Sequence, residues 1–173
     1  MQRWWLYLFL IMLPCCKGFA SLTISNKLTI NAEVALNTCA LTLSPANINF
    51  QQVSVSQLEN NATTPQIVNL DIDCSWPATG VSIKFSPVAG VSSNSENLMK
   101  TGISGVGLAL SWKNNGSTDF SSMDFNKSFT PTVALSNSKG SLGQFRLQPK
   151  IITEEALQAG STSTSLTVEV TYD

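Results

Sequence analysis

The sequence predicts an all-β domain built as a two-sheet sandwich, and three observations lead to that class. Apolar and polar residues alternate with a period of two along much of the chain, helical periodicity is almost absent, and polar turn-forming segments separate the alternating runs. Short strands at this spacing favour a sandwich of immunoglobulin type over a barrel.

Each alternating run has one apolar face, as expected of a strand that packs against a core. The clearest runs are residues 68–74, 81–85, 145–147 and 166–172. Loops are expected where residues that tolerate turn dihedrals gather, at 92–95, 114–117 and 137–140. Residues 154–159 allow at most a short helical turn.

The first 20 residues form a segment of another kind, typical of a secretory signal peptide. Arg3 gives it a cationic start, residues 4–16 are apolar without a break, and small residues suit a cleavage site after Ala20. Because the apolar run is shorter than the ~20 residues that span a bilayer, a membrane anchor is the weaker interpretation. Lipid attachment at Cys15 or Cys16 lacks the small preceding residue that it requires.

Composition excludes several classes of function. Two of the ten basic residues leave with the signal peptide, so eight basic residues face eleven acidic ones in the 153 residues that remain, a net charge of −3 that does not favour nucleic acid. The chain has no histidine, which removes Ser-His-Asp and Cys-His catalysis and the commonest transition-metal ligand. We expect no enzymatic activity, no cofactor, no metal site and no membrane insertion.

The exported part keeps two cysteines, Cys39 and Cys74. They allow a single internal pairing, and in an oxidising compartment a disulfide across this 35-residue separation stabilises a domain by about 3 to 4 kcal/mol. A redox-active pair is the alternative, but no Cys-x-x-Cys spacing supports it.

Other candidate sites have a simpler structural interpretation. Asp71 and Asp73 lie about 7 Å apart on one strand face, a separation that paired catalytic carboxylates also use, but a solvated outer face explains them better. No helix pattern follows Gly107, so the neighbouring glycines are not a phosphate loop. Sugar stacking or core packing can explain the aromatic residues, and packing is favoured for the set Trp76, Trp112, Phe120, Phe125 and Phe129.

The longest alternating run follows the signal peptide, over residues 22–36. Fifteen extended residues span about 50 Å, whereas a domain of this size has a radius of gyration of about 15 Å. Either the strand bends near Asn31 and Ala32 and stays in its own molecule, or its first ten residues leave to pair elsewhere. The second alternative is favoured, because the apolar side chains at stake are worth roughly 6 to 12 kcal/mol of burial and an exposed apolar edge aggregates.

Several motifs, taken in order, resemble the pilins that the chaperone-usher pathway of Gram-negative bacteria assembles. Residues 27–39, KLTINAEVALNTC, resemble that family's first strand with its cysteine, and residues 71–74, DIDC, resemble the strand with the second cysteine. Residues 105–110, GVGLAL, an Ala-Gly pair at 159–160 and the next-to-last Tyr172 follow the same pattern. The resemblance covers essentially all of the exported chain.

The resemblance implies an incomplete immunoglobulin-like sandwich of six strands whose seventh strand is supplied in trans. A groove then lies open beside the last strand. A periplasmic chaperone fills it first, and at the outer-membrane usher the N-terminal extension of the next subunit replaces the chaperone strand by donor-strand exchange. The expected function is a structural fimbrial subunit, major or minor, that is exported through the periplasm to the cell surface and supports cell adhesion.

The resemblance also assigns residues. It divides the chain into a signal peptide at 1–20, a donor-strand extension at 21–32 and a pilin domain at 33–173. The expected donor residues are Leu22, Ile24, Asn26, Leu28 and Ile30. The expected acceptor-groove and chaperone contacts are Val168, Val170, Tyr172 and Asp173.

Two donor positions depart from the family, which commonly has glycine where this chain has Asn26 and Ala32. A polar amide in a groove needs space and a hydrogen-bond partner. Assembly with a specialised neighbouring subunit is therefore an alternative to self-polymerisation. The rival function is a self-contained secreted binding domain, for a carbohydrate or a protein, whose N-terminal strand folds back on itself.

Overall fold

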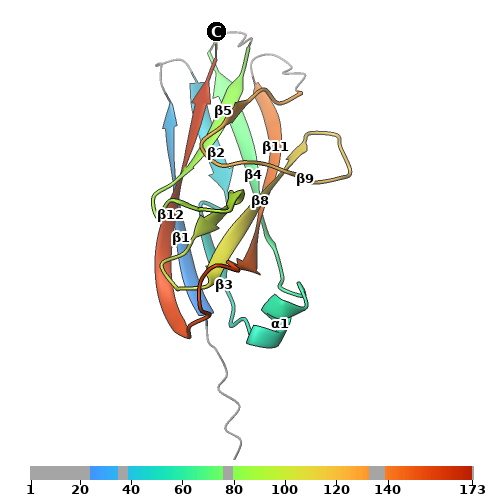
Figure 1. Cartoon of the computed structure of the whole chain (residues 1–173). Coiled ribbons are helices and arrows are strands. Elements are labelled where there is room, and N and C mark those ends of the chain that lie inside the picture. The colour runs from blue at the N-terminus through green and yellow to red at the C-terminus, as the bar shows by residue number, and fades with distance from the viewer. Residues whose placement is uncertain (1–23, 35–38, 76–79, 133–138, 173) are drawn as a thin grey trace, which may run out of the picture.

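Two β-sheets pack face to face in the computed structural model, which describes residues 24–34, 39–75, 80–132 and 139–172 (Figure 1). The first sheet has the strand order β10 (Ser128–Phe129), β5 (Ser82–Pro87), β12 (Gly160–Thr171), β1 (Ile24–Val34) and β3 (Asn47–Phe50). The second has the order β2 (Cys39–Ser44), β4 (Gln66–Cys74), β11 (Lys139–Ile151), β8 (Val106–Asn114), β7 (Ser95–Lys100) and β6 (Val91–Ser92), and β9 (Ser121–Ser122) pairs with β8. The predicted all-β class is confirmed.

The core lies between the sheets and consists of the inward face of each alternating strand. In β4, Val68, Leu70 and Ile72 are buried, while Asn69, Asp71 and Asp73 face outward and are half-buried or exposed. An aromatic cluster joins the layers, with Phe85 of β5 next to Phe145 of β11 at 5.0 Å between ring centroids and next to Trp112 of β8 at 6.2 Å. Core packing is therefore confirmed for Trp112.

Two local features differ from the prediction. Lys139 and Gly140, expected in a loop, begin β11, where they pair with Asp73 and Ile72 of β4. Residues 154–159 agree with the prediction of at most a short helical turn, since they contain only a turn and bend that begins at Thr153. A five-residue helix, α1 (Val55–Glu59), was not predicted, because one turn is too short to show a helical period.

Local hydrogen bonds explain why α1 forms despite its length. The Ser54 hydroxyl accepts from the backbone N–H of Gln57, and the Gln57 side chain accepts from the backbone N–H of Ser54, which completes a capping box. Leu58 is buried at 2% exposure in a small second cluster with Val53, Ile103 and Val106. The helix thus closes one end of the sandwich, opposite the end where the chain terminates in Figure 1.

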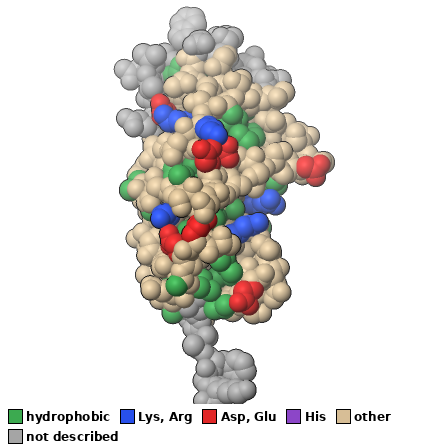
Figure 2. All heavy atoms as spheres, viewed as in Figure 1, with side chains coloured by type: hydrophobic (Ala, Val, Ile, Leu, Met, Phe, Trp, Pro, Cys, Tyr) green, Lys and Arg blue, Asp and Glu red, His purple; other side chains and the backbone are tan. Residues whose placement is uncertain are grey.

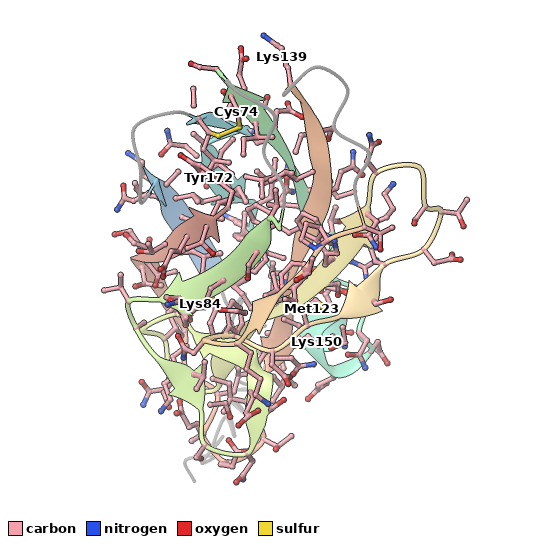
Figure 3. All side chains as sticks on the ribbon, turned by 90° about the horizontal axis from the view of Figure 1, so that it is seen from above. Cys74, Lys84, Met123, Lys139, Lys150 and Tyr172 are labelled. Atoms are coloured by element: carbon pink, nitrogen blue, oxygen red, sulfur yellow. A yellow bond between two sulfur atoms is a disulfide. The ribbon has the colours of Figure 1, made fainter. Side chains whose placement is uncertain are left out.

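Cys39 and Cys74 form the predicted disulfide (Figure 3). They stand directly opposite each other on neighbouring strands, with Cys39 at the start of β2 and Cys74 at the end of β4. Because β2 pairs with β4 alone, it is an edge strand, and the disulfide ties its first residue to the sheet.

Glu155 holds the turn that leads into β8. Its carboxylate accepts hydrogen bonds from Lys100 Nζ at 2.9 Å and from the backbone N–H of Gly105 at 3.1 Å. The hydrogen bond from Lys100, followed by that from Gly105, lowers the pKa of Glu155 below its ordinary value. Gly105 must be glycine, because its φ is +75° and an added Cβ would lie 2.6 Å from Leu157 Cα.

None of the helices in the described part of the chain has the length and apolar character needed to span a membrane.

Replacing Cys39 or Cys74 with serine should lower the free energy of unfolding by about 3 to 4 kcal/mol, because the unfolded chain regains the freedom of a 35-residue loop. Urea unfolding of the oxidised wild type and of each variant measures it. Treatment of the wild type with a reducing agent should reproduce the loss. Equal stability of the oxidised wild type, the reduced wild type and the serine variants would show that the disulfide has no such effect.

Replacing Glu155 with glutamine should lower Tm at pH 7 and have less effect in acid. A carboxylate with a lowered pKa stabilises the fold above its unfolded pKa of about 4.3, and this contribution disappears as pH falls through the lower folded value. Thermal melts of wild type and Glu155→Gln from pH 7 to pH 3 measure the difference, with the exposed Glu59→Gln as control. A gap in Tm that does not narrow in acid would contradict this account.

Candidate functional site

The N-terminal alternating segment lies in its own domain as β1, between β12 and β3. It runs parallel to β12, in an unbroken register from Ile24 opposite Gly160 to Val34 opposite Val170. On its other side it pairs antiparallel with β3, from Asn26 opposite Phe50 to Thr29 opposite Asn47. Figure 1 shows the blue β1 beside the red β12, so the first and last described strands are neighbours.

Alternation along β1 places Leu28 and Ile30 in the core. Leu28 is fully buried and Ile30 is 6% exposed, whereas Lys27 and Asn31 are exposed. Leu28 stands between Thr164 of β12 and Ile48 of β3, and Ile30 stands opposite Leu166. Two of the five predicted donor positions thus face the core, as the pattern requires.

The remaining donor positions are described less fully. Leu22 lies outside the described residues, and Ile24 and Asn26 are placed as strand backbone in register with Gly160 and Thr162. The donation of these residues to another subunit stays a prediction.

The groove that holds β1 has a wall on each side and a floor of core side chains. Its walls carry buried residues that belong to the same cluster as Leu28, namely Leu166, Val168 and Val170 of β12 and Ile48 and Phe50 of β3. Their exposed fractions are all 2% or less, so they depend on a strand that covers them. The groove is therefore a strand-binding site formed by two strands of the same sheet.

The predicted acceptor residues lie in or beside this groove. Val168 and Val170 are in the core-facing row of β12, and Tyr172, just past its end, is half-buried against the same cluster. Asp173 lies outside the described residues. The role of these four residues toward a neighbouring subunit or a chaperone stays a prediction.

Sequence reasoning missed the second wall of the groove. Residues 47–50 lie outside the alternating runs from which strands were predicted, but Ile48 and Phe50 of β3 are each 2% exposed. The alternation of Asn47, Ile48, Asn49 and Phe50 was the available signal, although four residues are too few to separate a strand from a loop by period alone. Leu166 was recognised as a strand residue but not as part of the groove.

β1 continues past the position where the sequence suggested a boundary. Its register with β12 continues through Asn31 and Ala32 to Val34 without a shift. Ala32 is nevertheless exposed although it shares a sheet face with Leu28 and Ile30. The reason is that the β3 ladder ends at Thr29, so the last residues of β1 have a strand neighbour on one side only.

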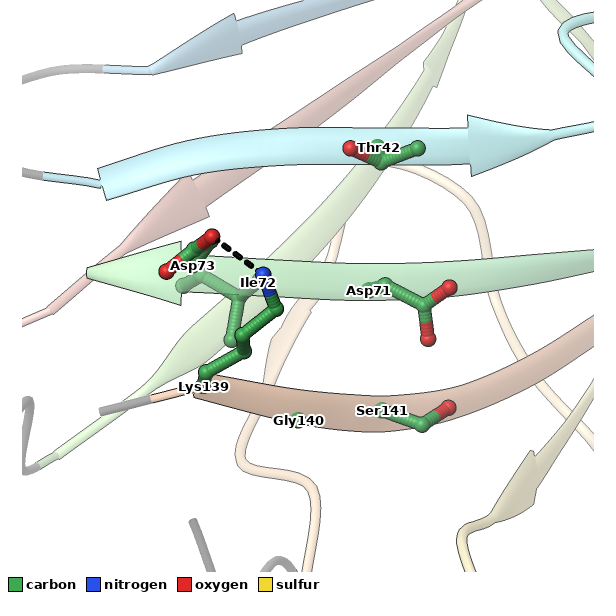
Figure 4. Close-up of a pocket in the computed structure, with 7 residues that line it drawn as sticks. All are labelled: Thr42, Asp71, Ile72, Asp73, Lys139, Gly140 and Ser141. Carbon is green, nitrogen blue, oxygen red and sulfur yellow. Dashed lines mark hydrogen bonds and ion pairs between the residues drawn. The ribbon is translucent and has the colours of Figure 1, made fainter. Parts of the chain in front are cut away.

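A second hollow lies on the outer face of β2, β4 and β11, with a volume of about 350 Å³ (Figure 4). It contains Asp71 and Asp73, the pair that was weighed as catalytic carboxylates. Asp73 accepts a hydrogen bond from Lys139 Nζ at 2.6 Å, which raises the pKa of Lys139, and it is exposed to solvent. This geometry fits the solvated outer face that the alternation predicted.

The surface carries no concentrated charge of one sign on the face seen in Figure 2, where basic and acidic side chains lie in small mixed groups. The described residues include ion pairs between Lys84 and Glu169 at 2.5 Å and between Lys100 and Glu155 at 2.9 Å. No group of three or more potential metal ligands occurs among the described residues. The groove around β1 is accordingly the site on which a function can be built.

Comparison with known proteins agrees with this geometry. The family model described as "Fimbrial protein" matches residues 27–173. A relative from Escherichia coli, Protein FanG, is 28% identical over 152 residues, which cover 87% of this chain and 86% of the relative. Both comparisons extend over most of the 173 residues.

Solved structures show the same fold. The rod subunit PapA of the P pilus superposes with a TM-score of 0.55 at 18% identity, and the match covers 79% of this chain and 100% of that subunit. A subunit in the structure of a chaperone-usher pilus superposes with a TM-score of 0.50 at 17% identity, covering 73% of this chain and 80% of that one. Because the family model matches most of the sequence, the chain belongs to the fimbrial protein family.

Proposed function

We propose that the protein is a structural subunit of a chaperone-usher fimbria that polymerises by donor-strand exchange and has no catalytic role. Residues 21–32 act as the donor strand for a neighbouring subunit, and the groove between β12 and β3 accepts the equivalent strand in return. A periplasmic chaperone holds the groove before assembly at the outer-membrane usher, and the finished fibre stands on the cell surface and supports adhesion.

One observation carries this proposal: the strand that fills the groove is the first of the described strands, so it can leave without breaking the path of the chain through the others. β1 comes first among the described elements, and the path of the chain from β2 to β12 does not depend on it. Its two ladders use backbone groups of β12 and β3, which any strand of similar pattern can satisfy. A second copy of this chain carries the same alternating pattern in its residues 21–32.

The energetics make an empty groove unfavourable. Burial of Leu28 and Ile30 contributes about 3 to 6 kcal/mol, a large part of the 5 to 15 kcal/mol that stabilises a typical domain. Loss of β1 would also leave the inner edges of β12 and β3 without hydrogen-bond partners. Exchange therefore needs one strand to enter as another leaves, which supports the participation of a chaperone.

The end of β12 supports the assignment of chaperone contacts. Val170 is 1% exposed and Tyr172 packs beside it on the same cluster, so a strand bound along β12 reaches the last residues of the chain. The carboxylate of Asp173 then offers an anionic group to basic chaperone residues.

The position of β1 also favours a second candidate, a self-contained binding domain. With its groove filled by its own β1, the chain buries its core in a single molecule. The two candidates predict different oligomeric states for the mature chain when it is produced without other fimbrial proteins. A subunit should give oligomers that resist mild detergent, whereas a self-contained domain should stay a monomer at every concentration.

Removal of residues 21–30 should turn the chain into a subunit that can accept a donor but cannot donate. Co-expressed with the wild type and a chaperone, it should bind the chaperone and end fibres instead of extending them, because no strand reaches the next groove. Fibre length by electron microscopy and the ladder of detergent-resistant oligomers measure this effect. Fibres of normal length with the deleted chain present throughout would refute the donor role.

Replacement of Leu28 by alanine should lower the free energy of unfolding of the purified chain by about 2 to 5 kcal/mol, because Leu28 is fully buried between β12 and β3. Replacement of the adjacent, exposed Lys27 by alanine should change the free energy of unfolding by less than about 0.5 kcal/mol. Urea unfolding of both variants provides the comparison. Equal stabilities would contradict the placement of β1 in the groove.

A further inference from the structure

We propose that Thr164 is a specificity residue of the acceptor groove, whose hydroxyl hydrogen-bonds the side-chain amide of Asn26 in a donor strand. The inference rests on the proposed function, since it concerns a strand that enters from another subunit. The partner of Thr164 is an extended apolar strand with one side-chain amide at a defined position.

Thr164 is an unusual residue for the place that it occupies. It is 8% exposed and belongs to the core-facing row of β12, which continues with Leu166, Val168 and Val170. Its Oγ1 is buried and has no hydrogen-bond partner. A buried hydroxyl without a partner costs about 1 to 3 kcal/mol, so its presence beside the buried apolar residues of this row calls for a partner that the single chain does not supply.

The donor segment has a matching irregularity. Positions 22, 24, 28 and 30 of its inward-facing row are Leu22, Ile24, Leu28 and Ile30, and position 26 is the single polar member. An amide placed in an apolar groove needs a hydrogen-bond partner just as the hydroxyl does. The donor row therefore contains one polar residue, and the buried part of the acceptor row, from Thr164 to Val170, also contains one.

In the single chain the two polar positions are out of register. Leu28 stands opposite Thr164, while Asn26 stands opposite Thr162, which is half-buried and donates its hydroxyl to the carbonyl of Ser163 at 3.5 Å. The register of β1 in its own domain thus sets a leucine against the unpartnered hydroxyl. A difference of two residues separates this arrangement from a matched one.

A donor strand that sets position 26 opposite Thr164 also matches the apolar positions. If it runs antiparallel to β12, Ile24 comes opposite Leu166 and Leu22 opposite Val168. If it runs parallel, Leu28 comes opposite Leu166 and Ile30 opposite Val168. In both directions the amide and the hydroxyl form one polar pair, and two of the four aliphatic donor side chains meet aliphatic partners, while the other two stand opposite Thr162 and Gly160 at the start of β12.

A double-mutant cycle tests the pair. The purified mature chain, wild type or Thr164→Val, is mixed with an excess of a fluorescent peptide of residues 21–34, native or with Asn26→Val. The rate and yield of the detergent-resistant complex are measured. Thr167→Val is the matched control, because Thr167 is on the same strand but on its other face and is half-buried.

The native peptide should enter the wild-type groove about 10-fold better than the Asn26→Val peptide, and Thr164→Val should abolish or reverse that preference while Thr167→Val leaves it unchanged. Melting of the Thr164→Val chain alone at an unchanged or higher temperature shows that it folds and that a lost preference is not a loss of structure. An identical preference in the wild-type and Thr164→Val chains would overturn the role of Thr164 while leaving donor-strand exchange intact. Failure of both peptides to enter any chain would overturn donor-strand exchange and this inference with it.

Discussion

The core-facing row of β12 must be covered by a neighbouring strand, and the architecture follows from that requirement. Leu166, Val168 and Val170 are almost fully buried, and they share one hydrophobic cluster with β3, β5 and the strands of the second sheet. β5 covers one edge of β12, and β1 covers the other. Without β1, the cluster opens to water and two strand edges lose their partners.

This requirement underlies the proposal that one segment serves two molecules. The groove recognises an extended backbone through its ladders and an alternating apolar pattern through its side-chain row, and it does not depend on which chain supplies them. The single chain meets the requirement with its own β1. In the proposed fibre each subunit gives that segment to a neighbour and receives an equivalent one, so the buried area is kept while the connectivity changes.

The sequence predicted the fold class, the disulfide and the inward positions Leu28 and Ile30, because strand alternation and cysteine pairing are local, countable signals. It did not predict that β3 forms a wall of the groove, since Ile48 and Phe50 belong to a four-residue strand whose pairing is set by β1. It also suggested a boundary near Asn31. The ladder of β1 with β12 continues there to Val34, a register that depends on tertiary contacts, and the division into donor extension and domain stays a prediction. The sequence did not single out Thr164, because a threonine before an alternating run is common and its burial depends on tertiary packing.

The central claim is that β1 of one chain lies beside β12 of another in the fibre. Disulfide mapping tests it most directly: fibres are assembled from a chain with Thr29→Cys mixed with chains that carry a single cysteine in place of Ser161, Ser163, Ser165 or Thr167 on β12. The account predicts a disulfide-linked dimer of two different chains for at least one of these pairs, and the reactive position gives the register. Cross-links that form only when both cysteines are on the same chain would contradict it.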